Sequence, residues 1–267
     1  MALTLAAGIG FASEIVFALV VEKLLGVQIS RPPVVTARMI ADGPGATYLY
    51  KKCPQAGLVA CEFVDRLLSH SDAFLWDTSP ATGIYARAPI EKRRELGNEQ
   101  FRFAAGVLAY DPVGQIAAWL NDAFLQLRMV GLSDFAATEI SLPRLPRVHA
   151  ERMARSSVWR KDFPIKIFSA LTIFAAILSF MFVCVTLIGH WKDVSVEQKI
   201  FCFVILLGEA SNALICGALS GPHELYQGRL TWLIPLVALL LSYERWLSSK
   251  VGASSLSMGD WRLLHRR

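Results

Sequence analysis

Hydrophobic residues along the chain gather into long runs that are typical of membrane-spanning helices. The clearest run, residues 167–189, has no charged side chain and is long enough to cross about 30 Å of hydrocarbon. Further runs cover residues 200–219, 230–247 and 1–25. Only helices and closed barrels satisfy the backbone in lipid, and runs of this length are helical. The pattern therefore predicts an all-α membrane protein with four transmembrane helices.

The first run has a second interpretation, because an N-terminal hydrophobic stretch can be a signal peptide. It lacks a basic start, Glu14 interrupts it, and no small-residue cleavage site follows it. We therefore interpret residues 1–25 as an uncleaved spanning helix. The missing basic start also leaves open that the chain begins inside a longer polytopic protein.

Residues 26–166, between the first two runs, are more polar and long enough for a compact domain. Apolar residues at helical spacing predict helices at residues 57–70 and 91–108, and an Asp-Gly-Pro-Gly turn begins at Asp42. Residues 71–90 are rich in turn signals and are expected to form an ordered loop. We expect a mostly helical domain that ends in a basic connector before the second run.

A third helix of this domain is predicted at residues 112–131, with Asp111 as its N-cap, Pro112 at its first position and Gly131 at its end. Its apolar stripe is formed by Val113, Ile116, Leu120, Phe124 and Leu127. The stripe could face the domain core or the membrane surface. Core packing is the commoner arrangement.

Charge and composition refine this topology. The chain is 54% hydrophobic and 18% charged, which excludes a disordered chain, and its net charge is +5. The tail at residues 248–267 is basic and is predicted to be cytoplasmic. Four spans then place both termini in the cytoplasm and residues 26–166 in the periplasm of a bacterial inner membrane. The basic residues flank membrane segments, so they indicate lipid headgroups and not nucleic acid as their partner.

The five cysteines fall into two groups. Three lie in predicted spans, where a thiol behaves as a small hydrophobic group. Cys53 and Cys61 lie in the predicted external domain, where an oxidising compartment favours a disulfide between them. His70 is the only histidine near this pair, so a zinc site is not expected. The sequence predicts no metal and no cofactor.

Glu209 is a functional candidate because ionisable groups inside membranes are rare. It could be a proton-linked or substrate-facing carboxylate, or a protonated side chain bonded to Asn212 or to a neighbouring helix. The same helical face continues as a ridge of small residues, Ala213, Gly217 and Gly221. Such a ridge favours close packing against another helix, within this chain or in a membrane-protein partner.

The short turn after this span is the second candidate. It contains His223, Glu224, Tyr226 and Arg229 within seven residues. An Arg and a His at the membrane interface could bind the phosphate of a lipid or a sugar phosphate. The alternative is an interfacial turn in which Tyr226 and Arg229 are anchors. Hydrolase, P-loop and zinc-protease motifs do not occur in the sequence.

Three stretches resemble an uncharacterised family of bacterial multi-pass inner-membrane proteins: residues 38–45 (Arg-Met-Ile-Ala-Asp-Gly-Pro-Gly), Cys53-Pro54…Cys61, and residues 212–229. Family members often carry Asp-Arg-Tyr where this chain has Glu-Leu-Tyr from Glu224. The layout is distantly similar to the C-terminal part of GT-C type glycosyltransferases, which use lipid-linked sugars. Those enzymes have an essential acidic residue in their first external loop, and no residue of this chain is matched to it.

Two functions are compatible with these features. The first is a non-catalytic accessory or scaffold component of a membrane complex, which meets its partner through the external domain or the small-residue ridge. The second is an envelope enzyme acting on a lipid-linked sugar phosphate. For that enzyme the candidate catalytic residues are His223, Glu224, Glu209 and Asp42, and the candidate phosphate-binding residues are Arg229 and Tyr226.

Overall fold

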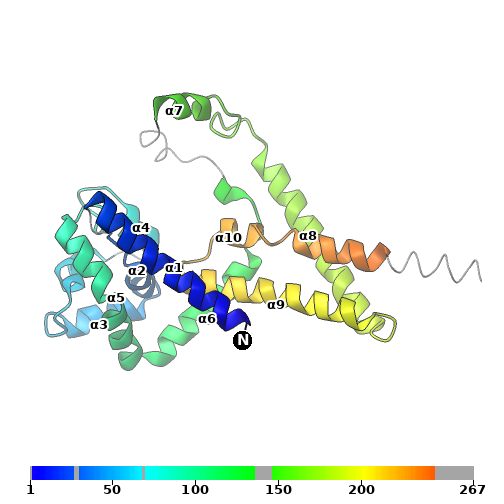
Figure 1. Ribbon diagram of the computed structural model, residues 1–267, viewed down its shortest axis with the longest axis horizontal. Coiled ribbons are helices and arrows are strands. Elements are labelled where there is room, and N and C mark those ends of the chain that lie inside the picture. The colour runs from blue at the N-terminus through cyan, green and yellow to red at the C-terminus, as the bar shows by residue number, and fades with distance from the viewer. Residues whose placement is uncertain (1, 27–29, 68–69, 136–145, 244–267) are drawn as a thin grey trace, which may run out of the picture. The chain divides into compact units, whose positions relative to one another are not determined.

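A computed structural model of the chain describes residues 2–26, 30–67, 70–135 and 146–243 (Figure 1). Regular secondary structure within these ranges is entirely helical, which confirms the all-α part of the prediction. The chain divides into two compact units, Met1–Ala117 and Ala118–Arg267. The division falls within α6 (Pro112–Arg128) and not at residue 166, where we expected the external domain to end.

The N-terminal unit consists of short helices and α5 packed around α2, together with one long N-terminal helix. In chain order its elements are α1 (Ala2–Leu25), α2 (Val34–Ala41), α3 (Pro44–Lys52), η1 (Val59–Arg66), α4 (Ser71–Trp76) and α5 (Ile90–Tyr110). Its core is formed by fully buried Met39, Leu49, Phe74 and Phe103, one from each of α2 to α5. α1 coincides with the first predicted hydrophobic run.

The predicted turn between α2 and α3 is present. Gly43 has a φ of +103°, a conformation that favours glycine, and Pro44 occupies the start of α3. Gly45 then lies so close to α2 that a Cβ atom would be 2.5 Å from the backbone of Met39. These residues fix the tight reversal that places α2 against α3.

The helix expected at residues 57–70 was wrong in type. The structure has the 3-10 helix η1 there, and α4 begins in the segment expected to be a loop. The apolar residues Leu58, Cys61, Val64 and Leu67 are spaced three apart. That spacing matches the three residues per turn of a 3-10 helix better than the 3.6 of an α-helix.

The C-terminal unit contains the long hydrophobic helices. Its elements after α6 are η2 (Ser133–Phe135), α7 (Arg147–Ala154), α8 (Ile165–Gly189), α9 (Val196–Leu219), α10 (Glu224–Gly228) and a last helix at residues 233–243. α9 begins four residues before the predicted span because Ser195 and Gln198 form a capping box. Residues 244–267, which include the end of the last predicted span and the basic tail, lie outside the described part.

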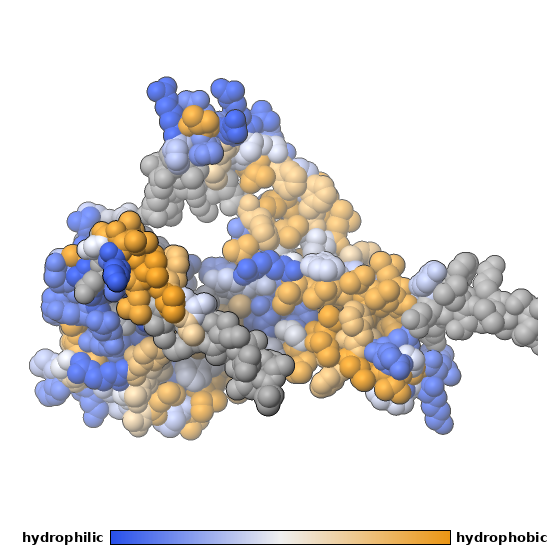
Figure 2. Space-filling view, in the orientation of Figure 1, coloured by the Kyte–Doolittle hydropathy of each residue, from blue (hydrophilic) through white to orange (hydrophobic). Residues whose placement is uncertain are grey.

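Within the described residues, three segments are long and apolar enough to cross a membrane: α8, α9 and Glu224–Tyr243. They pack on one another through Val183, Cys202, Val237 and Leu241, all buried. Their outer surfaces carry large hydrophobic side chains, and Figure 2 shows these hydrophobic residues covering the helices. An apolar exterior around a small core is what a membrane protein requires.

Candidate functional site

The turn that joins α9 to α10 gathers most of the polar side chains singled out in the sequence. α9 ends at Leu219, and Gly221, with a φ of +109°, reverses the chain while its N–H donates to the carbonyl of Cys216 at 2.9 Å. α10 then begins at Glu224. This reversal returns the side chains of α10 to the last turns of α9.

Glu209 is buried at the centre of a hydrogen-bonded group, with 5% of its surface exposed. The amide of Gln227 donates to Oε2 of Glu209. Nδ2 of Asn212 donates to Oε1 of Gln227 at 3.0 Å and to the carbonyl of Tyr226 at 3.2 Å. Oε1 of Glu209 has no hydrogen-bond partner among the residues that the structure describes. One of the two interpretations of Glu209 was a bond to Asn212 or to a neighbouring helix. The partner is Gln227 of the neighbouring helix α10, and Asn212 binds Gln227.

His223, Tyr226 and Arg229 lie together, as the spacing in the sequence predicts. The rings of His223 and Tyr226 meet edge to face with centroids 5.7 Å apart, and the guanidinium of Arg229 lies 5.5 Å from the centroid of Tyr226. Tyr226 also shares a 2.8 Å hydrogen bond with Ser220. Arg229 is exposed, so its cationic group is accessible to an anion.

Glu224 does not face this cluster. Its carboxylate accepts a hydrogen bond from the backbone N–H of Ser133 in η2. The carboxylate also lies against Gly131, where an added Cβ atom would collide with it. Gly131 therefore does not end α6, which stops at Arg128; it provides space for Glu224. A carboxylate held in this way positions η2 against α10.

Two residues that the sequence analysis missed complete this group. Nε2 of Gln126 donates to the carbonyl of His223 at 2.7 Å, and Oε1 of Gln126 accepts from the N–H of His223 at 2.8 Å. Oδ2 of Asp134 lies 3.5 Å from Nδ1 of His223 and accepts from the N–H of Leu225 at 3.3 Å. For Gln126 the available signal was the polar face of α6, opposite its apolar stripe; Asp134 lies in η2, outside that helix.

The small-residue ridge of α9 is covered within this chain. Ala213, Gly217 and Gly221 are all buried. A Cβ atom on Gly217 would lie 2.6 Å from the backbone carbonyl oxygen of Asp122, so α6 crosses α9 in close backbone contact there. The prediction of close helix packing is confirmed, with α6 as the packed helix.

Asp42 belongs to the N-terminal unit, where it is bonded within its own polar group. Its Oδ1 lies 2.6 Å from Nη2 of Arg38, and its Oδ2 accepts from Nε2 of Gln115 at 2.7 Å. The Asp42 side chain is fully buried. The motif at residues 38–45 thus contains an internal ion pair, and the hydrogen bond from Gln115 to Asp42 joins the end of α2 to the start of α6.

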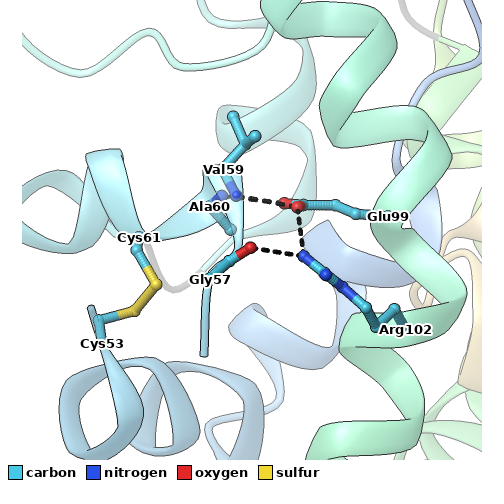
Figure 3. Close-up of a disulfide and its surroundings, with 7 residues drawn as sticks. All are labelled: Cys53, Gly57, Val59, Ala60, Cys61, Glu99 and Arg102. Carbon is cyan, nitrogen blue, oxygen red and sulfur yellow. Dashed lines mark hydrogen bonds and ion pairs between the residues drawn. A yellow bond between two sulfur atoms is a disulfide. The ribbon is translucent and has the colours of Figure 1, made fainter. Parts of the chain in front are cut away.

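The predicted disulfide between Cys53 and Cys61 is present and joins the end of α3 to η1 (Figure 3). Beside it, the carboxylate of Glu99 accepts from the backbone N–H groups of Val59 and Ala60 at 2.8 and 2.9 Å. Arg102 donates to the carbonyl of Gly57 at 2.6 Å. One covalent bond and a set of charge-assisted hydrogen bonds therefore hold the same loop against α5.

Metal-ligating side chains do not cluster in the described residues. They contain no group of three or more His, Cys, Asp or Glu side chains that could hold a metal ion. No known protein family matches the sequence, and comparisons with curated proteins and with solved structures found no match. The function must therefore be argued from the polar groups described above.

Proposed function

We propose that the protein is a non-catalytic accessory or scaffold component of a complex in a bacterial inner membrane. Four helices, α1 among them, cross the membrane, both termini are cytoplasmic, and the disulfide-bonded domain lies in the periplasm. One observation carries the proposal: the acids and amides around α9 and α10 hold the protein's own helices and turn together, which is a structural role. Gln126 and Glu224 bind backbone groups, and Glu209 and Asn212 bind Gln227.

The external domain supplies the surface for a partner. Tyr50, Phe101 and Tyr110 on α3 and α5 are between 40% and 73% exposed. A groove of about 410 Å³ between these helices is lined by Tyr48, Lys52 and Tyr110, with the ammonium of Lys52 above the ring of Tyr110. Exposed aromatic residues around a groove are typical of protein-binding surfaces.

The test is purification of the full-length protein from its native membrane. We expect a partner at constant stoichiometry that is lost in the variant Phe101→Asp and retained in the control Glu91→Arg, an exposed position at the other end of α5. A protein that purifies alone, or a partner that the Phe101→Asp variant retains, contradicts binding through this surface.

A second candidate function rests on the exposed guanidinium of Arg229 beside His223 and Tyr226. This group could bind the phosphate of a lipid-linked sugar in an envelope enzyme. If so, His223→Ala and Arg229→Ala change the envelope polysaccharide or lipid profile while protein abundance stays constant. Unchanged profiles exclude the enzyme.

The orientation is tested separately. A topology reporter fused after Arg267 should report a cytoplasmic C-terminus. A reporter that is active only outside the cytoplasm would overturn the orientation and, with it, the periplasmic placement of the disulfide.

A further inference from the structure

Helix α6 exposes its apolar face and buries its polar face, the reverse of a surface helix in a soluble domain. Its apolar stripe is exposed, with Leu120 60%, Phe124 58% and Leu127 42% accessible. Its opposite face is polar and buried, with Asp122 8% and Gln126 0% accessible. A surface helix in water shows the reverse pattern, with the apolar face in the core.

The contacts of α6 keep it in this orientation. Gln126 is joined to the backbone of His223 by two hydrogen bonds, and Asp122 lies in backbone contact with Gly217. A rotation that turned Phe124 inward would break both contacts. The exposed stripe is therefore a fixed feature of the C-terminal unit.

The stripe belongs to a helix that contacts the end of α9, one of the segments long and apolar enough to cross a membrane. α6 crosses the last turns of α9, where Leu214, Ile215 and Leu219 are about half exposed. α9 has 24 residues, or about 36 Å of helix, so its last turns reach the level of the headgroups. The loop after α6 stays at this level, because the N–H of Leu132 donates to Oγ of Ser169 in the first turns of α8.

We propose that α6 is an interfacial membrane helix whose face formed by Leu120, Phe124 and Leu127 inserts among lipid acyl chains. The polar face of α6 binds the turn between α9 and α10. In an ordinary interfacial helix the polar face would be in contact with water. The proposal requires that α8 and α9 span a membrane. It does not depend on whether the protein is a scaffold or an enzyme.

Three exposed phenylalanines provide a matched test. Phe124 in α6, Phe174 in α8 and Phe101 in α5 are 58%, 61% and 73% accessible. Photoreactive benzoyl-phenylalanine replaces each one in turn in the full-length protein, which is reconstituted in vesicles of phosphatidylethanolamine and phosphatidylglycerol. Mass spectrometry after illumination then identifies peptides cross-linked to phospholipid.

We expect the yield of lipid adduct at Phe124 to be comparable to that at Phe174 and about tenfold above that at Phe101, because the excited benzophenone reacts only with C–H groups in its immediate vicinity and an inserted helix face is surrounded by lipid. The same replacement at Leu120 should give the same result, so the test does not depend on one variant. A yield at Phe124 no higher than at Phe101 overturns the proposal. A cross-link from Phe124 to a second protein chain also overturns it, because that chain would then cover the stripe.

Discussion

The position of α6 against the turn between α9 and α10 depends on two hydrogen bonds between Gln126 and His223, and removing them tests it directly. Gln126 is fully buried, and its amide satisfies both the N–H and the carbonyl of His223. The variant Gln126→Met keeps the length of the side chain and removes both hydrogen bonds, so the N–H and the carbonyl of His223 lose their partner. Leaving a buried polar group unsatisfied costs about 1–3 kcal/mol.

For the two groups together we expect the free energy of unfolding to fall by about 2 kcal/mol, the low end of that range. The low end applies because hydrogen bonds in membrane proteins average roughly 0.6 kcal/mol and because the His223 side chain is 37% exposed. For a unit of the size of Ala118–Arg267 this corresponds to a fall in Tm of roughly 4–8 °C. The measurement is thermal unfolding of the detergent-solubilised protein, followed by circular dichroism. His223 itself is unchanged, so a stability effect reports on the position of the turn.

The matched control is Asn121→Leu, which also replaces an amide by an apolar group of similar size on α6. Asn121 is exposed, so its Tm should stay within about 2 °C of the parent protein, as is usual for surface substitutions. Equal Tm values for the two variants would refute the reasoning, because Gln126 would then contribute nothing that an exposed amide does not.

Three further predictions concern other contacts. Gly217→Ala should destabilise the protein by about 1–3 kcal/mol, because its Cβ would lie 2.6 Å from a backbone oxygen; Gly208→Ala on the same helix meets no atom within 4 Å and should be neutral or stabilising in the same unfolding assay. Reduction of the disulfide should lower the stability of the N-terminal unit by about 2–3 kcal/mol, measured by hydrogen exchange of the full chain with and without dithiothreitol. Hydrogen bonds from the hydroxyl of Thr82 and the N–H of Ser79 hold the pKa of Asp77 below its usual value. The stabilisation by Asp77 is therefore present above the usual carboxyl pKa and is lost as the pH falls through the lowered one. Thr82→Val should destabilise the protein at pH 7 and progressively less below about pH 4, in unfolding measured between pH 3 and 7.

Helix type and position followed from the sequence wherever one local signal dominated. Residues 167–189 had no charge to interrupt them, and α8 covers them and begins only two residues earlier. Asp111 was expected to cap α6, and its Oδ1 accepts from the N–H of Gly114 at 2.9 Å. The disulfide followed from two cysteines in one short segment. Each signal lies within a few residues of the feature that it predicts.

The candidate site was only partly predictable because its contacts join distant parts of the chain. Gln126 and His223 are 97 residues apart, and Glu224 reaches Ser133 across 91 residues. Local spacing placed His223 near Tyr226 correctly but gave no information about these partners. The apolar stripe of α6 was equally ambiguous, since a stripe has the same spacing whether it faces a core or lipid. The exposure of the stripe, together with the burial of Asp122 and Gln126 on the opposite face, shows that the stripe does not face a core.

The two proposed functions place different demands on Glu209 and Arg229. A catalytic acid must reach its substrate, whereas Glu209 is 5% exposed and is bonded to Gln227, which Asn212 in turn binds. These hydrogen bonds orient α10 on α9, which is a structural role for Glu209. Arg229 donates to the carbonyl of Leu225, lies over the ring of Tyr226 and is exposed, so it is the group best placed to meet a phosphate. If the chain is an enzyme, Arg229 is therefore a better candidate for its anion site than buried Glu209 is for its acid. If Arg229→Ala leaves the envelope polysaccharide and lipid profiles unchanged, the polar contacts around the turn have a structural role, as the scaffold proposal requires.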